Sequence, residues 1–301
     1  MSWFKIRPRK DNCTLEDLPH TRREEFFDIL KNRNDLLFFF GLSYLFLAIP
    51  FALVFFLSLT MKNQFYLNLE NQVIDKGTYM SEAALNAFYK DLLYLPCLLL
   101  FDLGISASLR IYRKLGFEEP LLLWGDILRG IKDNYVSVLL TSLVLYLGFF
   151  LSDIVKAYLP LNPEVYQVAI AYIPTALFMI VILPSGLFAF SAQAVYQDKW
   201  RKIFRNSMNF AISKFWCGAL FGFLFVAPFL ILELGATYVS IIFLLVYFLL
   251  YLPLLQEAFT LYSLHVFDEL INQEQYPNLY QKGLYESMIR VMKEEKHDES
   301  K

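Results

Sequence analysis

Histidine and cysteine are scarce in this chain, with three of each among 301 residues. The cysteines, Cys13, Cys97 and Cys217, lie far apart, and two of them fall within strongly apolar stretches. We therefore expect three reduced packing residues, not a disulfide framework or a redox pair. The histidines follow no His-Glu-x-x-His or Cys-x-x-Cys spacing, so the sequence predicts no metal site.

Motifs for nucleotide chemistry and proteolysis are also missing. The chain has no Walker-type lysine loop and no Gly-x-Gly-x-x-Gly, so no nucleotide or dinucleotide cofactor is expected. Its two Glu-Glu pairs, at 24–25 and 118–119, lack the arginine four residues later that prenyl proteases require. Basic residues mix with aromatic ones only beside apolar segments, so nucleic-acid binding is not expected. The sequence predicts a protein without enzymatic activity or a cofactor.

Long apolar runs dominate the chain, in which 57% of residues are hydrophobic and 18% are aromatic. Six segments approach the roughly 17–25 residues that a helix needs to cross a bilayer. They are residues 36–60, 92–109, 135–151, 168–189, 215–234 and 238–260. The predicted fold class is an all-α polytopic membrane bundle of six transmembrane helices.

Positive charge is distributed unevenly between these segments. In order along the chain, the flanking regions carry eight, three, five, one, five, no and five Lys and Arg residues. The positive-inside rule then places both termini in the cytoplasm of a multi-pass cell-membrane protein. The first apolar run exceeds the roughly 7–15 residues of a signal peptide core, so we expect it to remain as an anchor. The predicted division is a cytoplasmic segment 1–35, a six-span domain 36–266 and a cytoplasmic tail 267–301.

A weak repeat precedes the first, third and fifth spans. The pattern x-Ile-(Leu/Phe)-(Lys/Arg)-x-x-x-(Asp/Asn) begins at Asp28, Asp126 and Lys202. The returning spans contain Leu-Pro pairs at 95–96, 183–184 and 252–253. Two interpretations remain open: three pseudo-repeated hairpins around an axis along the membrane normal, or chance in a biased composition. On the outer side, only the connection 61–90 is expected to be long.

The segments that carry this pattern have amphipathic spacing. At 124–131 the apolar residues are Trp124, Ile127, Leu128 and Ile131, and the opposite face holds Asp126, Arg129, Lys132 and Asp133. At 200–205 the basic face is Arg201, Lys202 and Arg205, and at 24–30 the acidic face is Glu24, Glu25 and Asp28. We expect short helices in the cytoplasmic interface plane. They could anchor span ends or form a docking surface, for which the candidates are Trp124, Arg129, Lys132, Arg201, Lys202 and Arg205.

Ionisable residues inside spans are candidates for function, because each costs at least ~2.5–3.5 kcal/mol at the bilayer centre. Asp102 lies midway along the second span, with Ser106 one turn and Arg110 two turns further on the same face. Glu257 lies in the cytoplasmic half of the last span. If such residues line a transport path, the candidates are Asp102, Ser106 and Glu257. As structural groups, the carboxyls would be paired or protonated in the bundle.

Several blocks resemble the YesL-like family. The second span ending at 106–110, the block 124–129 with 132–134, the block 202–206, and the segments 267–272, 276–277 and 282–284 are similar to it. The resemblance covers most of 26–284. It implies a small multi-pass membrane protein of the kind found in Gram-positive bacteria, often beside carbohydrate ABC-importer components. The family has no assigned activity, so no site residues are carried over.

Two functions follow as hypotheses. The first is a non-enzymatic accessory protein that assists assembly, stability or gating of a carbohydrate ABC importer, with permease or ATPase subunits as partners. The second is a stand-alone secondary transporter of a small solute that uses intramembrane carboxylates. Besides the lipid bilayer and these subunits, a second copy of the chain is a further conceivable partner, whereas nucleic acid is not.

Overall fold

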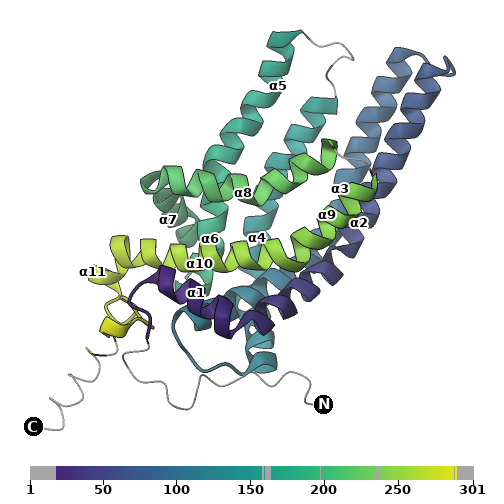
Figure 1. Cartoon of the computed structure of the whole chain (residues 1–301). Helices are drawn as coiled ribbons and strands as arrows, with labels where there is room; N and C mark the ends of the chain where they lie inside the picture. Colours follow the sequence, from purple (N-terminus) through teal and green to yellow (C-terminus); the bar gives the residue numbers. More distant parts are fainter. Residues whose placement is uncertain are drawn as a thin grey trace, which may run out of the picture.

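A computed structural model describes residues 18–157, 159, 164–196, 198–234, 237–287 and 289 (Figure 1). All regular structure within these residues is helical, which confirms the all-α class. The helices are α1 (Arg22–Asn32), α2 (Asn34–Glu70), α3 (Lys76–Gly116), α4 (Leu123–Ala157), α5 (Val165–Leu177), α6 (Leu183–Tyr196), α7 (Trp200–Ser213), α8 (Phe215–Leu234), α9 (Thr237–Val246), α10 (Leu252–Phe267) and α11 (Gln273–Gln275). Three π-helical turns, η2 (Phe178–Ile182), η3 (Tyr247–Tyr251) and η4 (Asp268–Asn272), join neighbouring helices.

Four of the described helices are long and apolar enough to cross a membrane: Asn34–Glu70, Lys76–Gly116, Leu123–Val155 and Ile241–Gln275. A fifth results if α7 and α8, bent by 107° at their junction, form one broken span. The fold is therefore a multi-pass helical bundle with four or five candidate spans, and six are not shown. The predicted span 168–189 crosses α5, η2 and α6, because the π-helical turn divides that run.

The first hairpin is much longer than a bilayer requires. Helix α2 has 37 residues and α3 has 41, which correspond to about 55–60 Å at 1.5 Å per residue, against about 30 Å of hydrocarbon. Only residues 71–75 connect them, and Asp75 caps α3 by accepting hydrogen bonds from the amides of Gly77 and Thr78. Residues 61–90, predicted to be a long outer connection, are helical on both sides of this short turn. In Figure 1 the ends of α2 and α3 that meet at this turn stand apart from the other helices.

Two of the Leu-Pro pairs directly follow a π-helical turn. In η2 and η3 the amides of Leu183 and Leu252 donate to the carbonyls of Phe178 and Tyr247, five residues earlier. A proline has no N–H, so each pair leaves a carbonyl four residues earlier without its usual partner. The third pair, at 95–96, lies within the α-helix α3. The second and third predicted hairpins thus share a local structure that the first does not.

The predicted interfacial helices are only partly correct. Residues 124–131 form the first turns of the continuous helix α4, not a separate helix. Trp124 and Leu128 are each 68% exposed, as an apolar face toward the bilayer requires, but Asp126, predicted on the polar face, is only 2% exposed. In α1 likewise, Glu25 was predicted on the acidic face but is fully buried, while Phe27 is exposed. Helix α7 follows the prediction, with its basic residues outward and Ile203 buried.

The main core lies where α1, α3, α6, α7 and α10 meet. At its centre, the ring of Phe188 on α6 contacts Phe210 of α7 and Phe259 and Phe267 of α10, with centroids 5.1–6.4 Å apart. The ring of Tyr112 on α3 is buried beside this cluster. Offset aromatic contacts of this kind each contribute about 0.5–1.5 kcal/mol beyond area burial. This packing fixes α1 and α10 against α3 and so positions the polar groups described next.

Candidate functional site

Asp102 is completely buried between α3 and α4. Its Oδ1 accepts a hydrogen bond of 2.7 Å from the hydroxyl of Ser142, and its Oδ2 has no partner among the described residues. The Ser106 hydroxyl donates to the main-chain carbonyl of Asp102, at 2.6 Å, and not to its carboxyl group. Arg110 pairs with Asp126 and Asp133 instead. The residues predicted on one face of α3 therefore do not share one carboxylate site.

Glu257, on α10, is completely buried in a different part of the bundle. Neither carboxyl oxygen accepts a hydrogen bond from the described residues. Glu25 on α1 and the hydroxyl of Tyr112 on α3 lie within electrostatic range of it, and this hydroxyl also has no described hydrogen-bond partner. Tyr112 lies ten residues beyond Asp102 on α3, about 15 Å along the helix. Asp102 and Glu257 therefore belong to separate sites.

Arg22, near the N-terminus of α1, connects three segments at this end of the bundle. Its guanidinium contacts the carboxylates of Glu25 at 2.9 Å and Asp268 at 3.3 Å. It also donates to the main-chain carbonyls of Gly116 and Lys282. Burial raises the pKa of Glu25 to about 8, although Arg22 opposes the shift. Arg22 thus fastens α1 to the end of α3 and to the C-terminal segment.

A second buried polar group lies between α2, α3 and α10. The hydroxyl of Tyr44 is in hydrogen-bond contact with Ser108, at 2.5 Å, and with the side-chain carbonyl of Gln256. The amide of Gln256 donates to the same serine at 2.9 Å. Each polar atom of this triad is satisfied within the protein, which is what a structural network requires.

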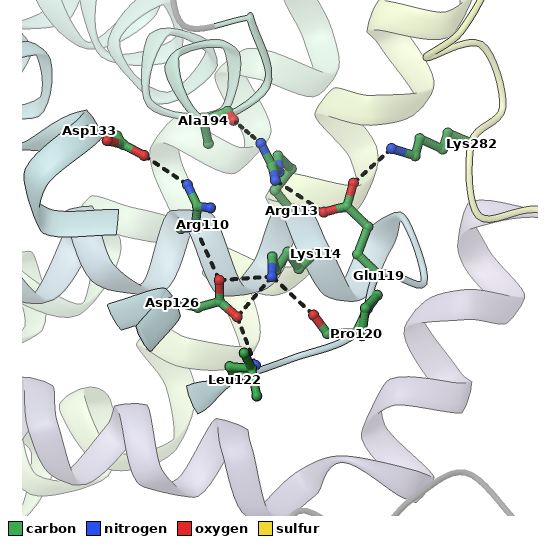
Figure 2. Close-up of polar contacts among 10 residues, drawn as sticks. All are labelled: Arg110, Arg113, Lys114, Glu119, Pro120, Leu122, Asp126, Asp133, Ala194 and Lys282. Carbon is green, nitrogen blue, oxygen red and sulfur yellow. Dashed lines mark hydrogen bonds and ion pairs between the residues drawn. The ribbon is translucent and has the colours of Figure 1, made fainter. Parts of the chain in front are cut away.

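Figure 2 shows that the basic end of α3 is fully engaged in ion pairs. Arg110 and Lys114 both contact the buried carboxylate of Asp126, at 3.3 and 2.8 Å. Arg113 and Lys282 contact Glu119 from two sides, at 3.1 and 2.7 Å. Burial alone would raise the pKa of Glu119, but these cations outweigh it and hold the pKa below its ordinary value. These contacts fix the loop between α3 and α4.

The predicted docking residues behave differently. Arg129, Lys132, Arg201 and Arg205 are exposed and form no ion pair with the described residues. Lys202 pairs with Asp198 at 2.6 Å, in contact with water. Trp124 is largely exposed and its ring meets the edge of Phe39 on α2. The six candidates therefore lie on the outside of α4 and α7, not in a common pocket.

Sequence reasoning missed Arg22, Glu25 and Tyr112 as members of a buried polar cluster. The amphipathic spacing at 24–30 predicts Glu25 on an acidic outer face with Glu24 and Asp28, but it is buried. A usable signal was present, since Arg22, Glu25 and Ile29 recur at i, i+3 and i+7 and are the buried residues of this helix. Nothing comparable marks Tyr112 among the tyrosines of α3.

The described residues contain no group of three or more acidic, histidine or cysteine side chains arranged to hold a metal ion. Cys97 and Cys217 are free thiols, and Cys13 lies outside the described residues. No family model matches this chain, and neither does any curated protein or solved structure.

Proposed function

We propose that this chain is a six-span protein of the cell membrane with both termini in the cytoplasm. In this role it is a non-enzymatic accessory protein that assists assembly, stability or gating of a carbohydrate ABC importer. The observation that carries the proposal is the contrast between two basic regions. The cations at the C-terminal end of α3, Arg110, Arg113 and Lys114, are all paired inside the fold, whereas four cations on α4 and α7 are exposed and have no described ion pair. The importer as partner comes from the sequence resemblance.

The position of these cations has an energetic cost. Arg201 lies in the first turn of α7, which contains no acidic residue, whereas Lys202 in the same turn is paired with Asp198. Positive charge at a helix N-terminus opposes the helix dipole by about 0.3–1 kcal/mol per charge. A group outside this chain, with negative charge, offsets that cost when it is bound. An acidic patch on a membrane partner and the anionic headgroups of the bilayer both meet this requirement.

Charge reversal separates these two occupants. Headgroup attraction is about 1 kcal/mol per basic residue, whereas a charge buried against a protein partner can cost about 2–5 kcal/mol when it is lost. We expect Arg129→Glu with Arg205→Glu to leave membrane insertion intact and to reduce co-purification of permease or ATPase subunits at least tenfold. The measurement is affinity purification in mild detergent with quantitative mass spectrometry.

The matched control reverses two exposed cations on the first hairpin, Lys62 and Lys76. This variant carries the same change in net charge and should recover partners at the wild-type level. Equal recovery from wild type and the Arg129/Arg205 variant would refute the docking role and leave α4 and α7 as membrane anchors.

The six-span topology predicts where fused reporters will lie. Fusions at residue 75 and within 160–164 should report the outer side, and fusions at 116, 198 and 301 should report the cytoplasm. The outer reporter at 160–164 and the cytoplasmic reporter at 198 require the chain to cross the membrane between them, through the segment that contains α5, η2 and α6. An inverted reporter at any of these positions would exclude the six-span arrangement.

A second candidate function is supported by Asp102, whose buried Oδ2 has no described partner. In a secondary transporter that uses this carboxylate, Asp102→Asn should abolish pH-dependent solute uptake and leave expression unchanged. If Asp102 is structural, the same variant should alter the melting temperature in detergent without a selective effect on uptake. Ser142→Ala removes the one described donor to this carboxyl and serves as the companion variant.

A further inference from the structure

Three buried carboxyl groups and one cation form a cluster between α1, α3 and α10. Glu25 and Asp268 contact Arg22, and Glu257 interacts electrostatically with Glu25. Among the described residues, Arg22 is the one cation that forms ion pairs with these carboxyls. If all three carboxyls were ionised, two negative charges would remain unbalanced in an environment that excludes water. Such a state costs several kcal/mol per ion, so the cluster reaches neutrality by binding protons.

The hydrogen bonds indicate where these protons reside. Asp268 accepts from Arg22 and also from the amide of Asn272, at 2.7 Å, so it has two donors for a negative charge. Glu257 has no described donor at either oxygen, and Glu25 has none at Oε1. Arg22 and Asp268 therefore form the charged pair, and the other two carboxyls hold a proton each. The orphan hydroxyl of Tyr112 adds a further polar atom beside Glu257.

We propose that Glu25 and Glu257 form an internal proton-binding site that exchanges protons with water at the α1 end of the bundle. Arg22 and Asp268, each 7% exposed, form the outer layer of the cluster, and the two glutamates are fully buried behind them. A proton therefore enters from water past Arg22 to Glu25 and moves on to Glu257, and it leaves by the same path. No electrons are transferred, and the proposal does not depend on a partner protein.

The cover over this entrance consists of α1 and the turns that precede the last described residues. The amide of Tyr285 donates to the carbonyl of Pro19 at 3.1 Å, and Arg22 donates to the carbonyl of Lys282. Gly283 adopts a φ of +90°, and a Cβ there would lie 2.7 Å from the carbonyl oxygen of Gly116. The N- and C-terminal segments thus close the site together by main-chain contacts.

The groups around the two glutamates come from several elements. Glu257 interacts with Glu25 of α1 and Tyr112 of α3, and Glu25 interacts with Arg22 on its own helix, with Asp268 of η4 and with Glu118, which follows α3. A sodium ion would need about six oxygen ligands, and this cluster offers fewer that are free. A proton needs only one acceptor, so the chemistry favours a proton over a metal cation.

Infrared spectroscopy of the purified protein in detergent tests the proposal directly. Protonated carboxyl groups absorb apart from carboxylates, so Glu257→Gln and Glu25→Gln should each remove one protonated-carboxyl band at neutral pH. The control is Glu24→Gln, which changes an exposed glutamate one residue from Glu25 and should leave these bands unchanged. A wild-type spectrum without protonated-carboxyl bands, or bands unchanged in both site variants, would overturn the proposal.

Thermal stability provides a second readout. An amide replaces a protonated carboxyl group with little change in shape or charge, so Glu257→Gln should melt close to wild type at neutral pH. Because the pKa of Glu25 is raised from 4.5 to about 8, the folded state binds the proton more tightly, and wild-type stability should fall as pH rises through that interval. Glu25→Gln should flatten this dependence. If sodium raises the melting temperature of wild type but not of Glu257→Gln, the site binds a cation and the proton proposal fails.

Discussion

Gly41→Ala is expected to prevent recovery of folded protein or to lower its melting temperature far more than an ordinary helix substitution. A Cβ at this position of α2 would lie 1.9 Å from the carbonyl oxygen of Leu249 and 2.8 Å from its carbonyl carbon. Both atoms belong to the backbone of η3, so no side-chain rotation can relieve the contact. Overpacking a core typically costs about 1–3 kcal/mol, and separating two helices costs more.

The contact at Gly41 has a structural reason. Leu249 lies within η3, four residues before Pro253, which has no N–H to donate to the carbonyls of this turn. The close approach of Gly41 brings its Cα hydrogens against the carbonyl oxygen of Leu249, in the geometry of a weak Cα–H···O contact. Any side chain would exclude that contact. Glycine is therefore required here for close approach and not for backbone flexibility.

Gly125→Ala is the matched control, because Gly125 also lies within a helix, α4. The nearest heavy atom to a Cβ there is 3.8 Å away, in the side chain of Leu122. This substitution should stabilise the helix by about 0.5–1 kcal/mol. Thermal unfolding in detergent, followed by fluorescence-detected size exclusion, compares the two variants. Equal melting temperatures would show that α2 and η3 do not pack as described.

Arg22→Gln is expected to cost about 3–5 kcal/mol, because it leaves the buried carboxyls of Glu25 and Asp268 without a cation. It also removes the donors to the carbonyls of Gly116 and Lys282. Acidic buffer should partly restore stability, since protonation neutralises Asp268, whose charge the missing guanidinium no longer balances. The measurement is the melting temperature as a function of pH.

Arg23→Gln provides the comparison for this variant, since Arg23 is exposed on the next position of the same helix. It should change the melting temperature little and with no dependence on pH, as expected for an exposed charge. A loss of stability at Arg22 that acid does not reduce would show that its carbonyl contacts, not its ion pairs, hold α1 in place.

The class of fold could be predicted from the sequence because apolar run length directly reflects bilayer thickness. Helix ends were less predictable, since polar residues continue α2 and α3 well beyond the apolar part. Hydropathy does not record this extension, whereas the Asp75 cap does, and it marks the true start of α3. The division of segment 168–189 by η2 also leaves no signal in hydropathy, because a π-helical turn changes hydrogen bonding and not composition.

At the candidate sites, the main error of the sequence prediction was the direction in which side chains point. The sequence interpretation placed the charged residues of 124–133 toward water and the apolar ones in the membrane interface. Asp126 is instead buried in the protein, where it forms ion pairs with Arg110 and Lys114. Ion pairs between residues that are 12–16 positions apart and lie on two different helices cannot be predicted from the pattern of one helix. Arg129 and Lys132 are exposed, as predicted, and neither has a described partner on α3.

The π-helical turns also have a consequence for helical register. Each turn contains one residue more than an α-helical turn, so all side chains after it are rotated by about 100° relative to an uninterrupted helix. The face that α10 presents to its neighbours, Glu257 included, is therefore set by counting from Pro253 and not from the start of α9. A helical wheel drawn continuously through either turn assigns every later residue to the wrong side. Deleting one residue from η3 would restore a regular helix and turn Glu257 away from Glu25.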